Sequence, residues 1–388
     1  MSQQSFAEEA YRWLDSHCPP SLRGRQDAVT GGGRKDPLED PDGRRYFDAM
    51  YERGWTVPEW PREYGGAALG PDEHHALRTA MARIGAPAPL RGMGTSMIGP
   101  TLLEHGSDDQ KSRHLPRIAS GEIRWCQGYS EPGAGSDLAS LKTRAEDRGD
   151  HFVINGSKIW TSGAQLADWI FCLVRTDFEA PKHDGISFLL FSMDQPGVTV
   201  RPIRLISGIS PFCECFFDDV RAEKADLVGR LNRGWTIAKR LLQHERSSLS
   251  GTTPQTRAVP AVAREYVGLS EGRIADPALR RQLIDHEMDA RAFLLTHKRA
   301  REENTEGGTQ TFATSMFKLY RSELTKRRTE LIVSMMGTRG IGWEGEPFTP
   351  DESFETRFWL NRKAGTIAGG SSEVQRNIIA KRVLGLPD

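Results

Sequence analysis

The chain has 388 residues, of which 37% are hydrophobic, and its 52 Lys and Arg residues balance 52 Asp and Glu residues. A single hydrophobic core rarely grows to this size, so two or three domains are expected. The balanced charge gives no reason to expect binding to nucleic acid or to a membrane surface, and no long apolar run predicts a membrane span.

The N-terminal segment MSQQSFAEEAYRWLD lacks the basic and apolar regions of a secretory signal, which favours a cytoplasmic location. The five cysteines are scattered and form no CxxC pair. This spacing favours reduced thiols over a disulfide framework, and it predicts no metal site.

Residues 1–122 are predicted to form an N-terminal helical domain. Apolar residues recur at helical spacing from Phe6 to Cys18, and the Pro19-Pro20 pair ends that helix. A loop rich in Gly, Pro and charged residues follows at 23–43. The helical pattern then returns in three further segments, near 44–54, 71–86 and 108–118.

Residues 123–232 are predicted to form a middle β-domain, and residues 233–388 a second helical domain. Turn residues separate the β-rich runs at spacings typical of a sandwich or barrel. These runs cover residues 151–155, 169–175, 186–191, 198–203 and 214–217. An α–β–α succession with segregated helices predicts a multidomain α+β fold, not a doubly wound one, and neither a P-loop nor a GxGxxG after a strand is present.

Two neighbouring segments are candidates for ligand binding. The loop Ser130–Asp137 reads SEPGAGSD, and its glycines allow the backbone to approach a ligand closely. About twenty residues later, NGSKIWTS places Trp160 at a strand end among polar residues. From the residues alone, this tryptophan is interpreted as a packed core residue.

Glu245 interrupts an apolar helical stripe. The stripe includes Trp235, Ala238, Leu241 and Leu242, and helical spacing continues it to Glu245. A buried carboxylate costs several kcal/mol unless it is paired or functional. Glu245 is therefore either half of an ion pair or a general base whose pKa burial raises toward the working pH.

Together with the C-terminal segment IAGGSSEVQRNIIAKRVLGLP, these motifs resemble the acyl-CoA dehydrogenase family over the whole chain. The resemblance implies an N-terminal helical domain, a middle β-barrel or sandwich and a C-terminal four-helix bundle, with FAD between the last two. It implies α,β-dehydrogenation of an acyl-CoA thioester, in which a base removes the α proton while hydride passes from Cβ to the flavin N5.

The resemblance also assigns roles to individual residues. Ser136 and Arg246 match positions that contact the acyl-CoA, and the backbone N–H of Gly369 matches a donor to the thioester carbonyl. Glu373 matches a position near the FAD pyrophosphate, where a full negative charge is unfavourable. The positions that match contacts to FAD are Gln127, Gly128, Tyr129, Ser130, Trp160, Ser162, Ser371 and Glu373.

The chain departs from the commonest family pattern at the position of the catalytic base. Most members carry it near the C-terminus in a Tyr-Glu-Gly-Thr segment, where this chain has Gly369 in place of the glutamate. The isovaleryl and long-chain types place the base in a Glu-Arg pair on an earlier helix, which Glu245-Arg246 matches. Segments 265–273 and 334–340 lack the family's usual grip on the adenine half of FAD; Arg273 and Arg339 are the candidates to replace it.

The resemblance predicts electron-transfer flavoprotein as the acceptor and a homodimer or homotetramer as the assembly. Three alternatives remain open. The chain could be a non-catalytic partner subunit of a heteromeric dehydrogenase, which the altered FAD-grip segments favour. It could be an acyl-CoA oxidase that uses oxygen, or a related flavin enzyme whose substrate has no CoA.

Overall fold

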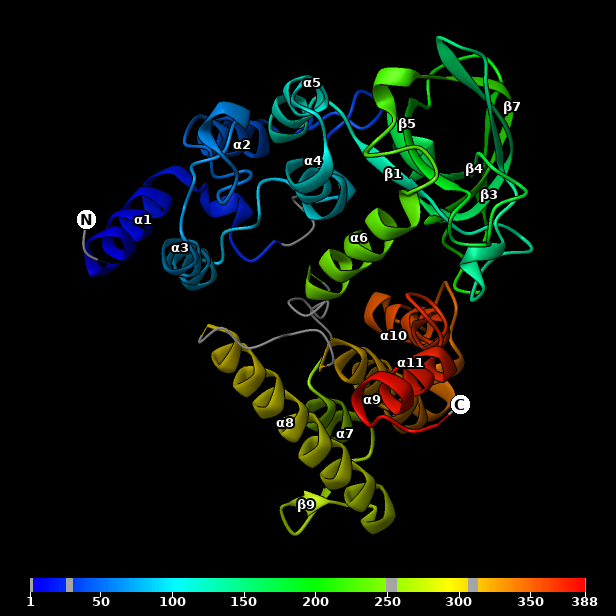
Figure 1. Ribbon diagram of the computed structural model, residues 1–388. Coiled ribbons are helices and arrows are strands. Elements are labelled where there is room, and N and C mark those ends of the chain that lie inside the picture. Colours follow the sequence, from blue (N-terminus) through cyan, green and yellow to red (C-terminus); the bar gives the residue numbers. More distant parts are fainter. Residues whose placement is uncertain (1–2, 26–30, 249–256, 306–312, 388) are drawn as a thin grey trace. The chain divides into compact units, whose positions relative to one another are not determined.

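The computed structural model describes residues 3–25, 31–248, 257–305 and 313–387, and all of their side chains except those of 3–4, 243–248, 301–305 and 313–314. The chain divides into two compact units. The first comprises residues 1–203 and 211–245, and the second comprises 204–210 and 246–388. Figure 1 shows the helices and strands of both. No helix among the described residues is long and apolar enough to cross a membrane.

The first unit begins with helices packed around their own core. The predicted helix from Phe6 to Cys18 is confirmed, with both side chains buried in that core. The Asp40 side chain accepts a hydrogen bond from the N–H of Asp42 and so caps the second helix. The helices are α1 (Gln3–His17), α2 (Pro41–Glu52), α3 (Pro71–Ile84), α4 (Gly99–His105) and α5 (Asp108–Ala119).

A curled seven-stranded sheet follows in the same unit (Figure 1). Its order is β1-β4-β2-β3-β7-β6, and β5 pairs with β4. The pairing of β1 with β4 is parallel, whereas β3 with β7 and β4 with β5 are antiparallel. The strands are β1 (Trp125–Gly128), β2 (Arg144–Asp147), β3 (His151–Ser162), β4 (Trp169–Arg175), β5 (Ile186–Ser192), β6 (Val198–Ile203) and β7 (Phe212–Glu223).

The strands β3 and β7 are longer than the sequence predicts. The turn-forming residues after Asn155 predict that the strand ends there, but β3 continues to Ser162. It does so because its pairing with β7 shifts register twice, between Ile154 and Gly156 and between Lys158 and Thr161. Such bulges keep a strand paired while re-aiming its side chains.

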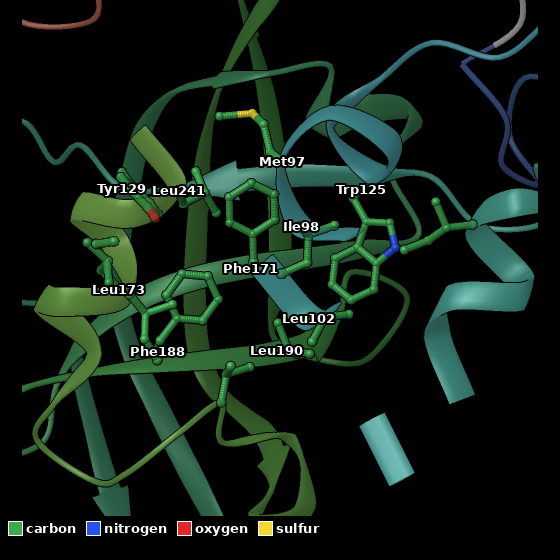
Figure 2. Packing of buried hydrophobic residues seen from close by; sticks show 14 of the residues in the cluster. Met97, Ile98, Leu102, Trp125, Tyr129, Phe171, Leu173, Phe188, Leu190 and Leu241 are labelled. Atoms are coloured by element: carbon green, nitrogen blue, oxygen red, sulfur yellow. The ribbon is translucent and has the colours of Figure 1, made fainter. Parts of the chain in front are cut away.

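Two hydrophobic clusters lie on opposite faces of β4. Ile170 and Cys172 point into the cluster enclosed by the curled sheet, and Phe171 and Leu173 point into the other. Figure 2 shows this second cluster, in which Met97, Ile98 and Leu102 meet Tyr129, Phe171, Phe188 and Leu241. A strand covered on both faces reads as a continuous apolar run, as WIFCLV does.

All five cysteines are free and buried. Four of them, Cys126, Cys172, Cys213 and Cys215, belong to the cluster inside the sheet. Burial is the main cause that raises the pKa of Cys172 and of Cys215 to about 12.

The helix α6 (Gly234–Ser248) follows the sheet, and its Ile237, Ala238 and Leu241 are buried in the first unit's second cluster. The second unit is mainly helical, with a core that α7, α8 and α9 share. Its elements are α7 (Val259–Tyr266), β8 (Leu269–Ser270), β9 (Arg273–Ile274), α8 (Pro277–Thr305), α9 (Ala313–Met336), α10 (Pro350–Arg362) and α11 (Ser372–Ile378).

Candidate active site

The end of β1 brings backbone and side-chain groups to one place. Gly128 is packed so tightly that a Cβ there would lie 2.8 Å from the Ile170 Cδ1 and 2.9 Å from the Cys172 Sγ. The ring of Tyr129 is buried against Phe171. The Nε2 of Gln127 is buried and donates no hydrogen bond to any described residue, so this amide is a directed donor without a protein acceptor.

The loop Ser130–Asp137 is closed at its base and open on its outer side. Reciprocal backbone hydrogen bonds of 3.1 and 3.0 Å join Glu131 and Ala134. A Cβ added at Gly133 or Gly135 would meet no atom within 4 Å, and Ser136 is exposed. The loop therefore presents Ser136 and a bare backbone to a ligand.

The second bulge of β3 turns Trp160 outward. Ile159 leaves the β7 ladder and donates its N–H to the Ser130 carbonyl at 2.8 Å. Trp160 has φ +60°, a region that residues other than glycine occupy at a cost. Its side chain is 53% exposed and lies edge-on to the Phe212 ring. This exposure rules out a packed core tryptophan, and the half-buried Ser162 follows two residues later.

These groups fit a large planar ligand. Such a ligand needs an aromatic wall and a few directed polar groups. The exposed indole of Trp160 supplies the wall, and the buried Gln127 amide supplies a donor. The hydrogen bond from Ile159 to Ser130 joins strand β3 to the start of the loop. No cluster of three metal-binding side chains occurs among the described residues.

Behind this surface lies an ion pair that the sequence interpretation missed. Lys158 is fully buried and lies 2.8 Å from the Glu131 carboxylate. The period of the strand carried a signal for it, because Phe152, Ile154 and Lys158 are all at even positions and share the inward face.

The apolar stripe predicted for α6 is confirmed as far as its side chains are described. Ala238 and Leu241 are buried, and Trp235 and Leu242 are partly buried against the same cluster. The side chains of Glu245 and Arg246 lie outside the described residues. Their roles therefore stay predictions.

In the second unit, Gly369 and Gly370 form a turn with φ values of +66° and +88°. Gln375 donates to the Gly369 carbonyl at 3.3 Å, and Lys318 donates to the Gly370 carbonyl. The Ser371 hydroxyl accepts a hydrogen bond from the Val374 N–H and caps α11.

Glu373 and the two candidate arginines are at the surface of this unit. The pKa of the exposed Glu373 carboxyl is lowered by a backbone hydrogen bond and then by Ser371. Arg273 is exposed in the β8–β9 hairpin. Arg339 donates to the Pro347 carbonyl and lies 3.6 Å from Glu352, so it already has partners. None of these contacts tests a role in holding a cofactor.

Family models match the chain along nearly its whole length. The model of the N-terminal domain of acyl-CoA dehydrogenases matches residues 2–122. The model of the middle domain matches residues 126–220, and that of the C-terminal domain matches residues 232–384.

Individual relatives are similar over the same extent. The chain is 37% identical over 399 residues to acyl-CoA dehydrogenase IpdE1 of Mycolicibacterium smegmatis, covering 99% of this chain and 98% of the relative. Among solved structures, the Tcur3481-Tcur3483 steroid ACAD has a TM-score of 0.78 at 30% identity, with 100% and 98% of the chains covered. The ChsE4-ChsE5 complex from Mycobacterium tuberculosis has a TM-score of 0.74 at 28% identity, with the same coverage.

A bulged strand that presents an exposed tryptophan beside a glycine-rich loop thus occurs in a chain whose three parts each match the corresponding family domain. The chain belongs to the acyl-CoA dehydrogenase family, whose members are FAD-binding flavoprotein oxidoreductases.

Proposed function

We propose that this chain catalyses FAD-dependent α,β-dehydrogenation of a CoA thioester whose acyl group is bulky, of the size of a steroid. The observation that carries the reaction class is the outward-turned Trp160 beside the open loop Ser130–Asp137. The size of the acyl group is supported by whole-chain similarity to a steroid acyl-CoA dehydrogenase at 30% identity.

Residues of the first unit would hold the isoalloxazine ring. Trp160 would cover one side of it, the Gln127 amide would donate to it, and Ser130 and Ser162 would contact its edge. FAD, when bound, accepts the hydride that leaves the substrate Cβ. By resemblance, Ser371 and Glu373 would contact the remainder of the cofactor.

Glu245 would act as the base that removes the α proton. The support is the confirmed apolar stripe that precedes it on α6, together with Gly369, which has no side chain at the position of the usual glutamate. The Gly369 N–H would donate to the thioester carbonyl and favour loss of the α proton. Ser136 and Arg246 would contact the CoA portion.

The base assignment predicts a large loss of turnover for Glu245→Gln with FAD retained. A positioned base contributes about 10²–10⁴-fold, which corresponds to roughly 3–5 kcal/mol of barrier. Glu287→Gln, which changes an exposed glutamate on α8, is the matched control. Normal turnover by Glu245→Gln would show that the base lies elsewhere.

Restoring the commoner base position tests the same assignment from the other side. A glutamate at position 369 would need φ +66°, which costs on the order of 1–3 kcal/mol in a residue other than glycine. Gly369→Glu in the Glu245→Gln background is therefore expected not to recover activity. Recovery to near the original rate would mean that the two positions are interchangeable in this chain.

The substrate class can be identified from the flavin absorbance. The purified protein is titrated anaerobically with CoA thioesters of straight-chain, branched and steroid acids. We expect bleaching of the oxidised flavin by the bulky esters. Bleaching by short straight chains alone would contradict the proposed size, and a yellow protein that no thioester bleaches would point to a substrate without CoA.

A specific observation favours a second candidate, a subunit that works only with another acyl-CoA dehydrogenase chain. Two of the solved relatives are named as two-chain assemblies. On α8, the side chains of Ile284, Met288 and Leu295 are at least half exposed and lie on one stripe. An apolar stripe of this kind is typical of a subunit contact.

Mixing experiments separate the two candidates. A chain that is yellow and active alone supports the first. A colourless chain that takes up FAD only after mixing with a second dehydrogenase chain supports the second. For the acceptor, we expect reoxidation by electron-transfer flavoprotein; rapid reoxidation by oxygen alone would instead indicate an oxidase.

A further inference from the structure

The buried ion pair between Glu131 and Lys158 connects the segments that form the candidate flavin surface. The Lys158 Nζ lies 2.8 Å from the Glu131 Oε1 and donates to the Tyr129 carbonyl at 3.1 Å. The same carboxylate accepts from the N–H groups of Lys142 and Thr143 at 2.7 and 2.9 Å. One buried cluster thus holds the end of β1, the loop, the segment before β2 and strand β3.

Two of the residues assigned to the flavin, Ser130 and Trp160, lie within two residues of this cluster in the chain. Ser130 lies between Tyr129 and Glu131, and its carbonyl accepts the Ile159 N–H. Trp160 lies two residues after Lys158, within the bulge that starts at Lys158. A displacement of either charged side chain therefore shifts the backbone that carries Ser130 or Trp160.

The energetics of the pair favour a positioning role over a purely stabilising one. The Lys158 side chain is 0% exposed and that of Glu131 is 9% exposed. Removing two charges from water can cost as much as their attraction returns, so an apolar pair of similar volume stabilises a fold equally well. Unlike an apolar pair, the ion pair makes directional hydrogen bonds, and each of these bonds fixes the position of one backbone group.

The carboxylate stays ionised in this setting. Burial raises the pKa of Glu131, but Lys158 and the hydrogen bonds to the carboxylate outweigh burial and lower the pKa below its ordinary value. The Glu131 carboxylate is therefore an anion at neutral pH, and its contact with the Lys158 Nζ holds both side chains in place.

We propose that Glu131 and Lys158 are positioning residues for the flavin, which set the spacing between the Ser130 backbone and the Trp160 ring. This inference rests on the proposed function, since it takes FAD as the ligand of that surface. Neither residue touches the cofactor in this role. They act through the Tyr129 carbonyl and through the bulge of β3.

The test measures FAD affinity separately from folding. Apoprotein of Lys158→Met is titrated with FAD, and quenching of the flavin fluorescence gives the Kd. Circular dichroism of the same sample verifies that the apoprotein is folded. The matched control is Asp226→Asn, which removes a buried carboxylate of the same unit. Asp226 pairs with Arg113 at 2.8 Å, and neither residue is a candidate site residue. We expect the Kd of Lys158→Met to rise by about tenfold or more and that of the control to stay within about twofold.

A second variant keeps the inference testable if Lys158→Met does not fold. Glu131→Gln retains the volume and one acceptor oxygen, and we expect its Kd for FAD to rise by about three- to tenfold with a broadened visible flavin spectrum. Unchanged affinity and spectrum in the folded variants would overturn the positioning role while leaving the proposed function intact. An original chain that takes up no FAD would overturn both.

Discussion

Two buried glutamates, one in each compact unit, show opposite solutions to the same problem. Glu131 in the first unit has Lys158 and two backbone donors around its carboxylate. Glu355 on α10 is 1% exposed, and neither of its oxygens accepts a hydrogen bond within 3.5 Å from the residues that the structure describes. Burial therefore raises the pKa of Glu355, against weaker opposing effects of Arg328 and of Arg257, whereas the pKa of Glu131 is lowered.

The comparison of Glu131 with Glu355 shows that burial alone does not decide whether a carboxylate is charged. The donors around it decide, because they replace the hydrogen bonds that water gave. Glu131 is held as an anion by a complete set of partners. Glu355 is a local cost to folding, which the rest of the second unit offsets.

The largest expected effect comes from breaking the satisfied pair. Lys158→Met leaves the Glu131 carboxylate buried without its countercharge, and loss of one partner of a buried pair costs about 3–5 kcal/mol. We expect the free energy of unfolding in urea at pH 7 to fall by that amount. The double variant Glu131→Gln/Lys158→Met should recover part of the loss, since no unpaired charge remains. A single variant as stable as the original chain would mean that water reaches the pair.

The next largest expected effect is an increase in stability. Glu355→Leu removes a buried carboxylate that accepts no hydrogen bond within 3.5 Å from the described residues. A buried polar group without a hydrogen-bond partner costs about 1–3 kcal/mol, so its removal is expected to stabilise the fold. We expect a higher urea midpoint at pH 7. A lower midpoint would show that Glu355 makes an interaction that is worth more than its burial costs.

The smallest effect is a difference in pH dependence. Because the folded-state pKa of Glu131 lies below 4.5, its stabilising contribution is complete above pH 4.5 and is lost as the pH falls through the folded-state pKa. For Glu355 the folded-state pKa lies above 4.5, so the cost of its charge is complete at higher pH. That cost is relieved as the pH falls through the folded-state pKa.

Urea midpoints measured between pH 7 and pH 3 check both signs. On acidification, the original chain should lose stability relative to Glu131→Gln and gain stability relative to Glu355→Gln. Parallel curves for all three proteins would show that neither carboxylate titrates differently on folding. Exchanged signs would mean that the two sites had been assigned the wrong way round.

Much of the fold follows from local sequence patterns. The α–β–α succession, the end of α1 before Pro19 and the strand Trp169–Arg175 are all readable from periodicity and turn residues. The continuation of β3 to Ser162 was not readable. It depends on pairing with β7, which lies about sixty residues away in the chain, and long-range pairing overrides the local turn preference.

The candidate site divides in the same way. The glycine-rich loop and Trp160 could be singled out from the sequence, but the left-handed backbone at Trp160 could not, because it results from the hydrogen bond between Ile159 and Ser130. The partnership of Glu131 with Lys158 joins residues 27 apart through tertiary structure. Local sequence spacing indicates only that Lys158 lies on the inward face of its strand; it does not identify Glu131 as the partner.

The placement of the thiols has a practical consequence for studying this protein. The thiolate is the nucleophile that attacks thiol reagents. Burial raises the pKa of all five cysteines and shields them from solvent. The cysteines of the folded chain should therefore react only slowly with a maleimide, and opening of the first unit should expose them to rapid labelling. The labelling rate would then measure the rate of that opening. A single cysteine introduced at the surface could be labelled selectively with a dye or spin label while the five native cysteines are kept.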